Sequence, residues 1–259
     1  VLDPATGLDA RIASMRDHVA AVFGVILPEI RLTDDAALPA GSYAIRILGV
    51  EQARDRLEPE RMLALLPGPD TAAPAGRDVR EPVYGAPARW IGPDDQEEAA
   101  LEGLTVVSPS EVLATHLLEV VKRNFARLFG LKALRRQLDA LTQLSDADRA
   151  AANRRLIDEL VPDKVPMDLL LAVLRLLLEE RVSIRNMPLI LEAIAEARPT
   201  LGAAEAICEH VRQRLGFQLV AELRRADGTL PLVQLAPEWE DTFRRYQIEG
   251  EGDVALPPD

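Results

Sequence analysis

The chain has 259 residues, with 30 Lys and Arg against 42 Asp and Glu, so its net charge is −12. This acidic balance lacks the basic surface that nucleic acids and anionic membranes require, and it argues against both as partners. The length allows about two to four small compact units. The single cysteine, Cys208, excludes an intramolecular disulfide. Its helical spacing to apolar neighbours predicts a small buried side chain.

One helix and several strands are predicted in the first part of the chain. Apolar residues three or four positions apart over 8–23 predict a helix that Gly24 ends. Alternating apolar residues over 43–47 predict a half-buried strand. Further strands are predicted at 27–31, 62–66 and 104–107, and a loop at 67–80, which is rich in Pro and Gly. Asp34 is predicted to hold a turn through its side chain.

The middle of the chain, to about residue 198, is predicted to be helical. Ser108-Pro109-Ser110-Glu111 is a capping box with Pro in the first turn, and it predicts a helix that runs to Gly130. Ser145 and Asp146 predict the start of another helix, over 145–160.

A compact helical unit is predicted over 161–194. Asp168 is the predicted N-cap of an apolar helix over 169–180, and a second helix is expected to begin near Pro188. Because the first of these helices is apolar nearly all round, it is predicted to lie in the core of a helical domain. The residues chosen in this unit are Leu170, Leu174 and Arg185.

The pattern changes after Gly216. Two apolar runs, 219–223 and 230–235, flank Ala226-Asp227-Gly228-Thr229, and this arrangement predicts a β-hairpin. A short helix is predicted over 238–246.

The sequence contains no nucleotide-binding, metalloprotease or hydrolase motif. Its paired carboxylates are adjacent in sequence and therefore do not face each other, so they indicate solvated charge. His116 has no Asp, Cys or second His nearby and is interpreted as a structural residue. We therefore predict no catalytic residue, no metal and no cofactor.

Glu81-Pro82-Val83-Tyr84-Gly85 is the clearest candidate site. Pro82 and Gly85 predict a turn that presents Tyr84 at the surface, where an aromatic ring with a polar tip suits a protein partner. The alternative is that Tyr84 packs only against its own domain. Thr115, in the middle of a helix, would by itself indicate no more than a bond to the preceding turn.

Several blocks of this sequence resemble the cytoplasmic part of the type III export-gate family, which has flagellar and injectisome members. The matching blocks occur in family order and cover most of residues 11–216. They are Gly24 to Pro28, Tyr43-Ala44-Ile45, Glu81 to Ala88 with Trp90-Ile91, Gly103 to Val107, Ala114 to Leu117, Leu160-Val161-Pro162 and Ile190 to Ala193.

The resemblance implies a multi-domain α+β fold, in which small mixed α/β units precede an all-helical domain. The implied domains are 1–59 with 109–128, an inserted 60–108, a helical 129–200, and an incomplete C-terminal α/β domain over 201–259. No segment here reaches the ~18 consecutive apolar residues of a membrane span. The family's N-terminal membrane region would therefore be absent, and the intact protein would lie at the cytoplasmic face of the bacterial inner membrane.

The resemblance also implies a function without catalysis. The family's flagellar members receive export chaperones loaded with late substrates in a dent whose residues correspond to Glu81, Tyr84 and Thr115. Asp and Phe are commoner than Glu and Tyr at the first two positions. Contact with other export-apparatus proteins and self-association into a ring, commonly of nine subunits, are further expectations. The ring implies a subunit interface as the alternative to the core for Leu170, Leu174 and Arg185. The acid-Pro-x-aromatic-Gly motif favours a flagellar protein; an injectisome export gate and a purely structural ring scaffold are the alternatives.

Overall fold

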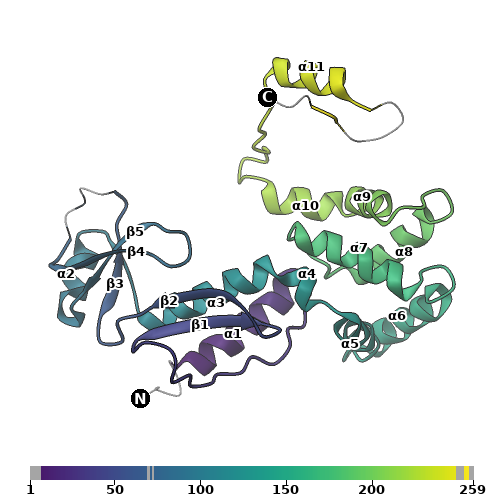
Figure 1. The fold of residues 1–259 in the computed structure, drawn as a ribbon. Coiled ribbons are helices and arrows are strands. Elements are labelled where there is room, and N and C mark those ends of the chain that lie inside the picture. Colours follow the sequence, from purple (N-terminus) through teal and green to yellow (C-terminus); the bar gives the residue numbers. More distant parts are fainter. Residues whose placement is uncertain (1–6, 69–70, 72, 249–253, 257–259) are drawn as a thin grey trace. The chain divides into compact units, whose positions relative to one another are not determined.

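The computed structural model describes residues 7–68, 71, 73–248 and 254–256 (Figure 1). The chain divides into two compact units, Val1–Leu215 and Gly216–Asp259. The first unit combines two small antiparallel sheets with a run of helices, as the predicted α+β fold requires. The finer division into four domains stays a prediction. None of the described helices is long and apolar enough to cross a membrane.

The first helix is the predicted one. α1 spans Leu8–Phe23 and buries Ile12, Met15 and Val19 on one face. Gly24 ends it with φ of 72°, a left-handed conformation that glycine adopts without the steric cost of a side chain.

A two-stranded antiparallel sheet follows, made of β1 (Ser42–Ile47) and β2 (Val50–Arg56). Its hairpin turn places Leu48 and Gly49 at positive φ, which suits the twist of a two-residue connection. The strand predicted at 27–31 is wrong: among the described residues no strand pairs with this segment. Val25 and Leu27 are nevertheless buried, so the apolar side chains that suggested a strand fill the core from an irregular segment.

The second sheet has four antiparallel strands in the order β4-β5-β3-β6. They are β3 (Met62–Leu65), β4 (Gly76–Arg80), β5 (Pro87–Ile91) and β6 (Thr105–Val107). A 3₁₀ turn (Pro93–Asp95) and α2 (Gln96–Leu101) precede β6, and Ala99 of α2 packs with Ile91. β3 and β6 confirm predicted strands.

The predicted loop over 67–80 is partly wrong. Its last five residues form β4, which pairs along β5, while residues 69, 70 and 72 of the prediction lie outside the described residues. β4 occupies the end of the sheet and carries a single apolar side chain, Val79, so it has no alternating pattern to recognise.

α3 (Pro109–Arg123) connects the two sheets. It begins with the predicted capping box, in which Glu111 accepts from the Ser108 backbone at 2.7 Å. One side of α3 packs against Ile45 and Ile47 of the first sheet, and Val112 packs with Trp90 of the second. The prediction of one helix as far as Gly130 is wrong. Asn124 separates α3 from α4 (Phe125–Leu128), and its side chain donates to the Val120 carbonyl at 2.8 Å.

Five further helices complete the first unit: α5 (Leu131–Thr142), α6 (Ala147–Leu160), α7 (Met167–Glu179), α8 (Met187–Ala197) and α9 (Ala204–Arg214). Asp146 caps α6 as predicted. The N-cap predicted at Asp168 is wrong, because α7 begins two residues earlier than predicted, at Met167, and Pro166 takes the N-cap position. Leu170 and Leu174 of α7 are completely buried within the chain. Cys208 is buried too, and burial raises the pKa of its thiol to about 11.

Three residues of the segment before α8 bind the end of α1. The Ser183 hydroxyl donates to the Val22 carbonyl at 2.7 Å, the Ile184 amide to that of Phe23 at 2.9 Å, and the Arg185 guanidinium to that of Ala21 at 3.1 Å. These donors supply the partners that the last carbonyls of a helix otherwise lack. Arg185, chosen from the sequence for the core or an interface, is exposed and holds this contact.

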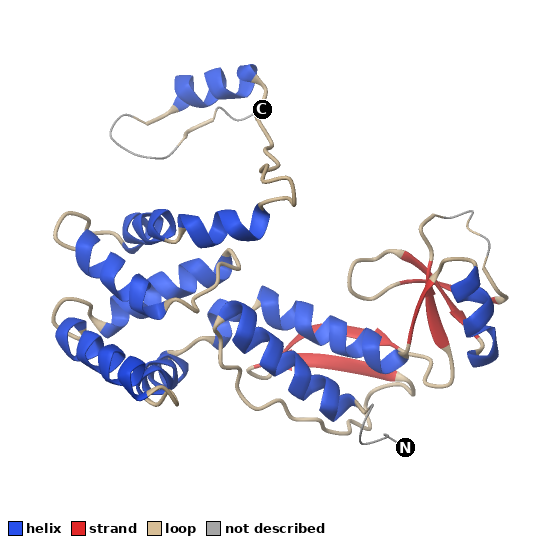
Figure 2. Cartoon of the chain, turned by 180° about the vertical axis from the view of Figure 1, so that it is seen from behind, coloured by secondary structure: helices blue, strands red, loops and turns tan. Residues whose placement is uncertain are grey.

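The second unit contains α10 (Gly216–Leu223) and α11 (Pro237–Tyr246), shown as helices in Figure 2. The predicted hairpin is wrong. Residues 219–223 belong to α10, and residues 230–235 are irregular and exposed and pair with no described strand. A short apolar run does not distinguish a strand from a helix, which explains the error. The helix predicted at 238–246 is confirmed.

Candidate functional site

The turn over 81–85 is held by a buried carboxylate. Glu81 is only 7% exposed, and its two carboxylate oxygens accept from the backbone amides of Val83 at 2.7 Å and Tyr84 at 2.8 Å. The Gly85 amide donates to the Glu81 carbonyl at 2.9 Å, and Gly85 has a φ of 70°. Glu81 therefore fixes the conformation of the turn, and with it the position of the Tyr84 backbone.

Tyr84 is exposed, with 70% of its surface accessible. The alternative in which Tyr84 packs only against its own domain is therefore wrong. The pKa of its hydroxyl is raised, first by desolvation and then by the negative charge of Glu119. An exposed aromatic ring with a polar tip, presented by a turn of fixed conformation, is the kind of side chain that anchors protein interfaces.

α3 brings Thr115 to the same region. Thr115 is exposed and lies one helical turn before Glu119, so the two side chains share a face of α3. Burial alone would raise the pKa of Glu119, but its ion pair with Lys122 brings the pKa below its ordinary value. Pro82 of the turn and His116 of α3 line one cavity, so the turn lies beside the part of α3 that carries Thr115. The structure brings together all three residues chosen from the sequence, with Glu81 behind the surface rather than on it.

His116, next to Thr115, points inward. It is buried, and its Nδ1 atom lies 2.6 Å from the Tyr43 hydroxyl of β1. The interpretation of His116 as a structural residue is confirmed, since it joins α3 to the first sheet. Desolvation lowers its pKa below the ordinary value of 6.5; Asp55 and Glu81 oppose this shift, and Arg123 adds to it.

This shift predicts a loss of stability in mild acid. Because the pKa of His116 is lower in the folded chain than in the unfolded chain, the unfolded chain binds more protons as the pH falls below about 6.5. We expect the free energy of unfolding to fall more steeply from pH 7 to pH 5 in the natural protein than in His116→Gln, as measured by urea unfolding. Parallel curves for the two proteins would contradict this expectation. The carboxylates with lowered pKa, such as Glu119, lose their contribution only at lower pH.

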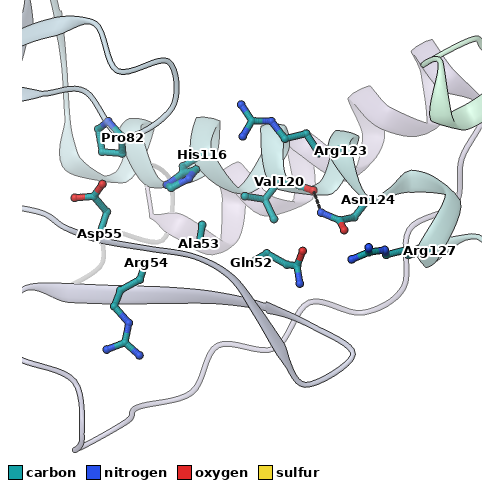
Figure 3. A pocket seen from close by; sticks show the side chains of 10 residues that line it. All are labelled: Gln52, Ala53, Arg54, Asp55, Pro82, His116, Val120, Arg123, Asn124 and Arg127. Atoms are coloured by element: carbon teal, nitrogen blue, oxygen red, sulfur yellow. Dashed lines mark hydrogen bonds between the residues drawn. The ribbon is translucent and has the colours of Figure 1, made fainter. Parts of the chain in front are cut away.

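A cavity of about 500 Å³ borders this region (Figure 3). β2 forms one wall, the helical residues of α3 and α4 form the opposite wall, and Pro82 of the turn contributes at one end. The charged side chains that line it are Arg54, Asp55, Arg123 and Arg127. The sequence prediction missed these residues. The available signal was the four-residue spacing of Thr115, Glu119 and Arg123, which is typical of one helix face. Arg127 lies beyond the break at Asn124, in α4.

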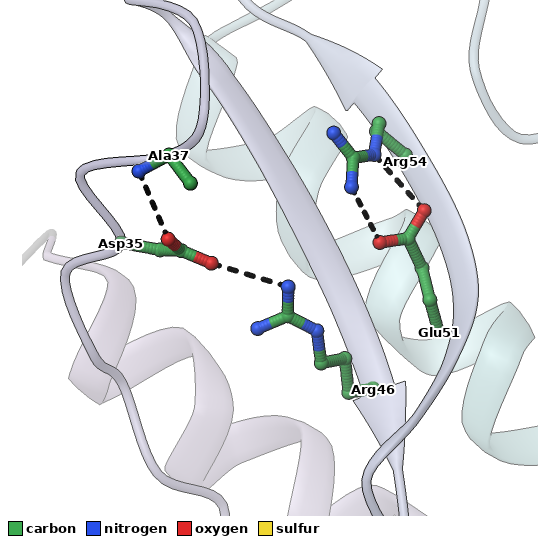
Figure 4. Close-up of polar contacts among 5 residues, drawn as sticks. All are labelled: Asp35, Ala37, Arg46, Glu51 and Arg54. Atoms are coloured by element: carbon green, nitrogen blue, oxygen red, sulfur yellow. Dashed lines mark hydrogen bonds and ion pairs between the residues drawn. The ribbon is translucent and has the colours of Figure 1, made fainter.

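Two ion pairs stabilise the sheet beside this cavity (Figure 4). Arg54 binds Glu51 through two hydrogen bonds of 2.9 and 2.7 Å, and Arg46 donates to Asp35 at 3.1 Å. The other oxygen of Asp35 accepts from the Ala37 amide at 3.0 Å, and these bonds lower the pKa of Asp35. The turn assigned to Asp34 is thus held by Asp35. Within the described residues no group of three or more His, Cys, Asp or Glu side chains could hold a metal ion.

The fold is shared with proteins of known structure. The Chlamydia pneumoniae CdsV protein superposes with a TM-score of 0.77 at 21% identity, covering 98% of this chain and 72% of CdsV. The nonameric EscV cytosolic domain from the type III secretion system superposes with a TM-score of 0.69 at 18% identity, covering 95% of this chain and 70% of EscV. The chain therefore has the fold of type III secretion cytosolic domains.

Curated relatives define the family more closely. The flagellar biosynthesis protein FlhA of Caulobacter vibrioides is 37% identical over 254 residues, which are 97% of this chain and 35% of that protein. FlhA of Bacillus subtilis is 30% identical over 251 residues, 96% of this chain and 36% of that protein. This chain belongs to the FHIPEP family, which it matches over residues 2–259. It spans about a third of the length of these relatives.

Proposed function

We propose that this chain is the cytoplasmic docking platform of a flagellar type III export gate. It binds export chaperones that carry late substrates, and the substrates pass from it to the membrane channel. The observation that carries the proposal is the exposed Tyr84, presented by a turn that Glu81 holds and that lies beside the part of α3 carrying Thr115. The identity to flagellar relatives favours the flagellar form over the injectisome form.

The chemistry of this surface suits protein recognition. An exposed ring on a rigid turn loses little conformational freedom on binding, so most of the free energy of its burial is available for affinity. The Thr115 hydroxyl and the Tyr84 hydroxyl supply hydrogen bonds that orient the partner. Catalysis has no role in this proposal.

The wider assembly follows from the same proposal. The platform lies at the cytoplasmic face of the inner membrane, self-associates into a ring and contacts other export-apparatus proteins. Two relatives of the same fold support this part: EscV is nonameric, and CdsV has been observed in complex with CdsO. A ring scaffold without chaperone binding is the competing function.

Calorimetric titration with purified chaperone–substrate complexes of the same flagellar system tests the proposal. Tyr84→Ala is expected to weaken binding by about 2 kcal/mol, or roughly thirtyfold in Kd, because a central aromatic anchor is lost. Phe217→Ala is the matched control, since Phe217 is a similarly exposed aromatic residue of α10, at 66%. We expect it to change Kd by less than about twofold.

The outcomes separate the candidate functions. Binding that is unaffected by Tyr84→Ala would place the docking site elsewhere. Binding only to injectisome chaperones would identify the other branch of the family. A chain that assembles into rings but binds no chaperone complex would be a scaffold.

A further inference from the structure

β2 has an open edge that faces a cavity. The strand pairs with β1 along one side, and no other described strand pairs with it. Four consecutive residues of β2, Gln52–Asp55, line the 500 Å³ cavity. Alternate side chains of a strand point to opposite faces, so four consecutive lining residues mean that the cavity runs along the edge of the strand.

The register of the hairpin identifies the backbone groups at this edge. The Leu57 amide donates to the Gly41 carbonyl at 2.8 Å, so the backbone of Leu57 points toward β1. Because the direction alternates along an antiparallel strand, Arg54 and Arg56 direct their amides and carbonyls outward. The Arg56 amide donates to the Asp55 carboxylate at 2.7 Å. In the described part of the chain, the Arg54 amide and carbonyl remain without a partner.

The opposite wall of the cavity is positively charged. Arg123 and Arg127 lie four residues apart on its helical side, and both are exposed. The ion pairs that α3 makes within the described residues use Glu111 and Glu119, with Arg11 and Lys122 as their partners. Arg123 and Arg127 therefore keep their charge for a ligand. In a chain with a net charge of −12, this local excess of arginine favours carboxylates.

We propose that an extended, acidic segment of the chaperone–substrate complex adds to β2 as a third strand. Its backbone bonds to the amide and carbonyl of Arg54, and its carboxylates bind Arg123 and Arg127. The lining part of β2 corresponds to about 13 Å of strand, which a segment of about four residues spans. Pro82 lines the cavity two residues before Tyr84, so this inference rests on the proposed function and extends its docking surface.

The backbone part of the proposal is tested by comparing two substitutions at one position. Arg54→Ala and Arg54→Pro both remove the guanidinium and its pair with Glu51, but only the proline removes the amide. That amide points away from β1, so its loss leaves the β1–β2 pairing intact. We expect Arg54→Pro to bind the purified chaperone–substrate complex about tenfold more weakly than Arg54→Ala. Equal affinities of the two variants would overturn strand addition.

Amide hydrogen exchange gives a second readout that needs no variant. Adding the complex to the natural protein should slow exchange at Arg54, while the amide of Leu57, already bonded to Gly41, changes little. Unchanged exchange at Arg54 would overturn the proposal even if a proline variant failed to fold.

The charge part is tested by Arg127→Glu against Arg136→Glu. Arg136 is an exposed arginine of α5 outside the cavity, so both variants change the net charge equally. Arg127→Glu should weaken binding about tenfold and Arg136→Glu less than about twofold.

If Tyr84→Ala weakens binding but Arg54→Pro and Arg127→Glu match their controls, only strand addition is overturned. If no complex binds the natural protein, both proposals are overturned. If the strand that pairs with β2 comes from a second copy of this chain and not from the complex, strand addition by the complex is also overturned.

Discussion

Replacing Gly24 by alanine is expected to lower the free energy of unfolding by at least about 3 kcal/mol. Two costs combine at this position. Gly24 has a φ of 72°, where a side chain costs about 1–2 kcal/mol. A Cβ atom would also lie 2.6 Å from both the backbone N and the Cα of Arg185. Removing this clash requires residues 183–185 to move away from the end of α1. Because these residues bind the last carbonyls of α1, their hydrogen bonds weaken as well.

Gly49→Ala is the matched control. Gly49 has a φ of 81°, but a Cβ atom there meets nothing within 4 Å. Its substitution should therefore cost only about 1–2 kcal/mol, the conformational part. Urea unfolding of the two variants beside the natural protein measures both values. Equal losses would mean that the close approach of Gly24 to Arg185 contributes nothing.

Leu174→Ala is expected to cost about 2–5 kcal/mol, because it leaves a cavity in a closely packed interior. Leu174 is completely buried within one copy of the chain, as is Leu170. This burial favours the core over the subunit interface that the family resemblance implied as the alternative. A side chain buried in the monomer contributes to the stability of the monomer, whatever the chain assembles into.

Thermal and urea unfolding at low protein concentration measure this loss. Leu101→Ala is the control, since Leu101 is 90% exposed and its truncation should change stability by less than about 0.5 kcal/mol. A Leu174→Ala variant as stable as the natural protein but altered in its self-association would contradict the core assignment.

Local chemistry made the helix boundaries the most predictable features. Gly24, the box from Ser108 to Glu111 and Asp146 each satisfy backbone groups at a helix end, and each lies where it was predicted. Such signals depend on residues three or four positions apart, so they do not require knowledge of the tertiary fold.

Two of the errors in strand prediction depend on pairing partners distant in sequence. β4 becomes a strand only because β5 is available to pair with it, and the segment 27–31 lacks such a partner among the described residues. Residues 219–223 carry an apolar run too short to distinguish a strand from α10.

The candidate site was predictable only in part. Its exposed Tyr84 and Thr115 were recognisable from the motif in which each occurs. The role of Glu81 in closing the turn depends on two backbone amides, and the cavity depends on the approach of β2 to α3. Arg123 and Arg127 were not predicted as site residues, because nothing in the sequence indicates which strand lies opposite a helix.

The contact between α1 and the segment before α8 has a consequence for the order of folding during synthesis. Val22 and Ser183 are 161 residues apart, so a ribosome adding about 5–20 residues per second needs roughly 8–32 seconds to deliver the second partner after the first. During that interval the carbonyls of Ala21, Val22 and Phe23 lack the donors that Ser183, Ile184 and Arg185 later supply. α1 is therefore synthesised long before its last carbonyls are bonded. It reaches its final set of hydrogen bonds only after the segment before α8 has been synthesised.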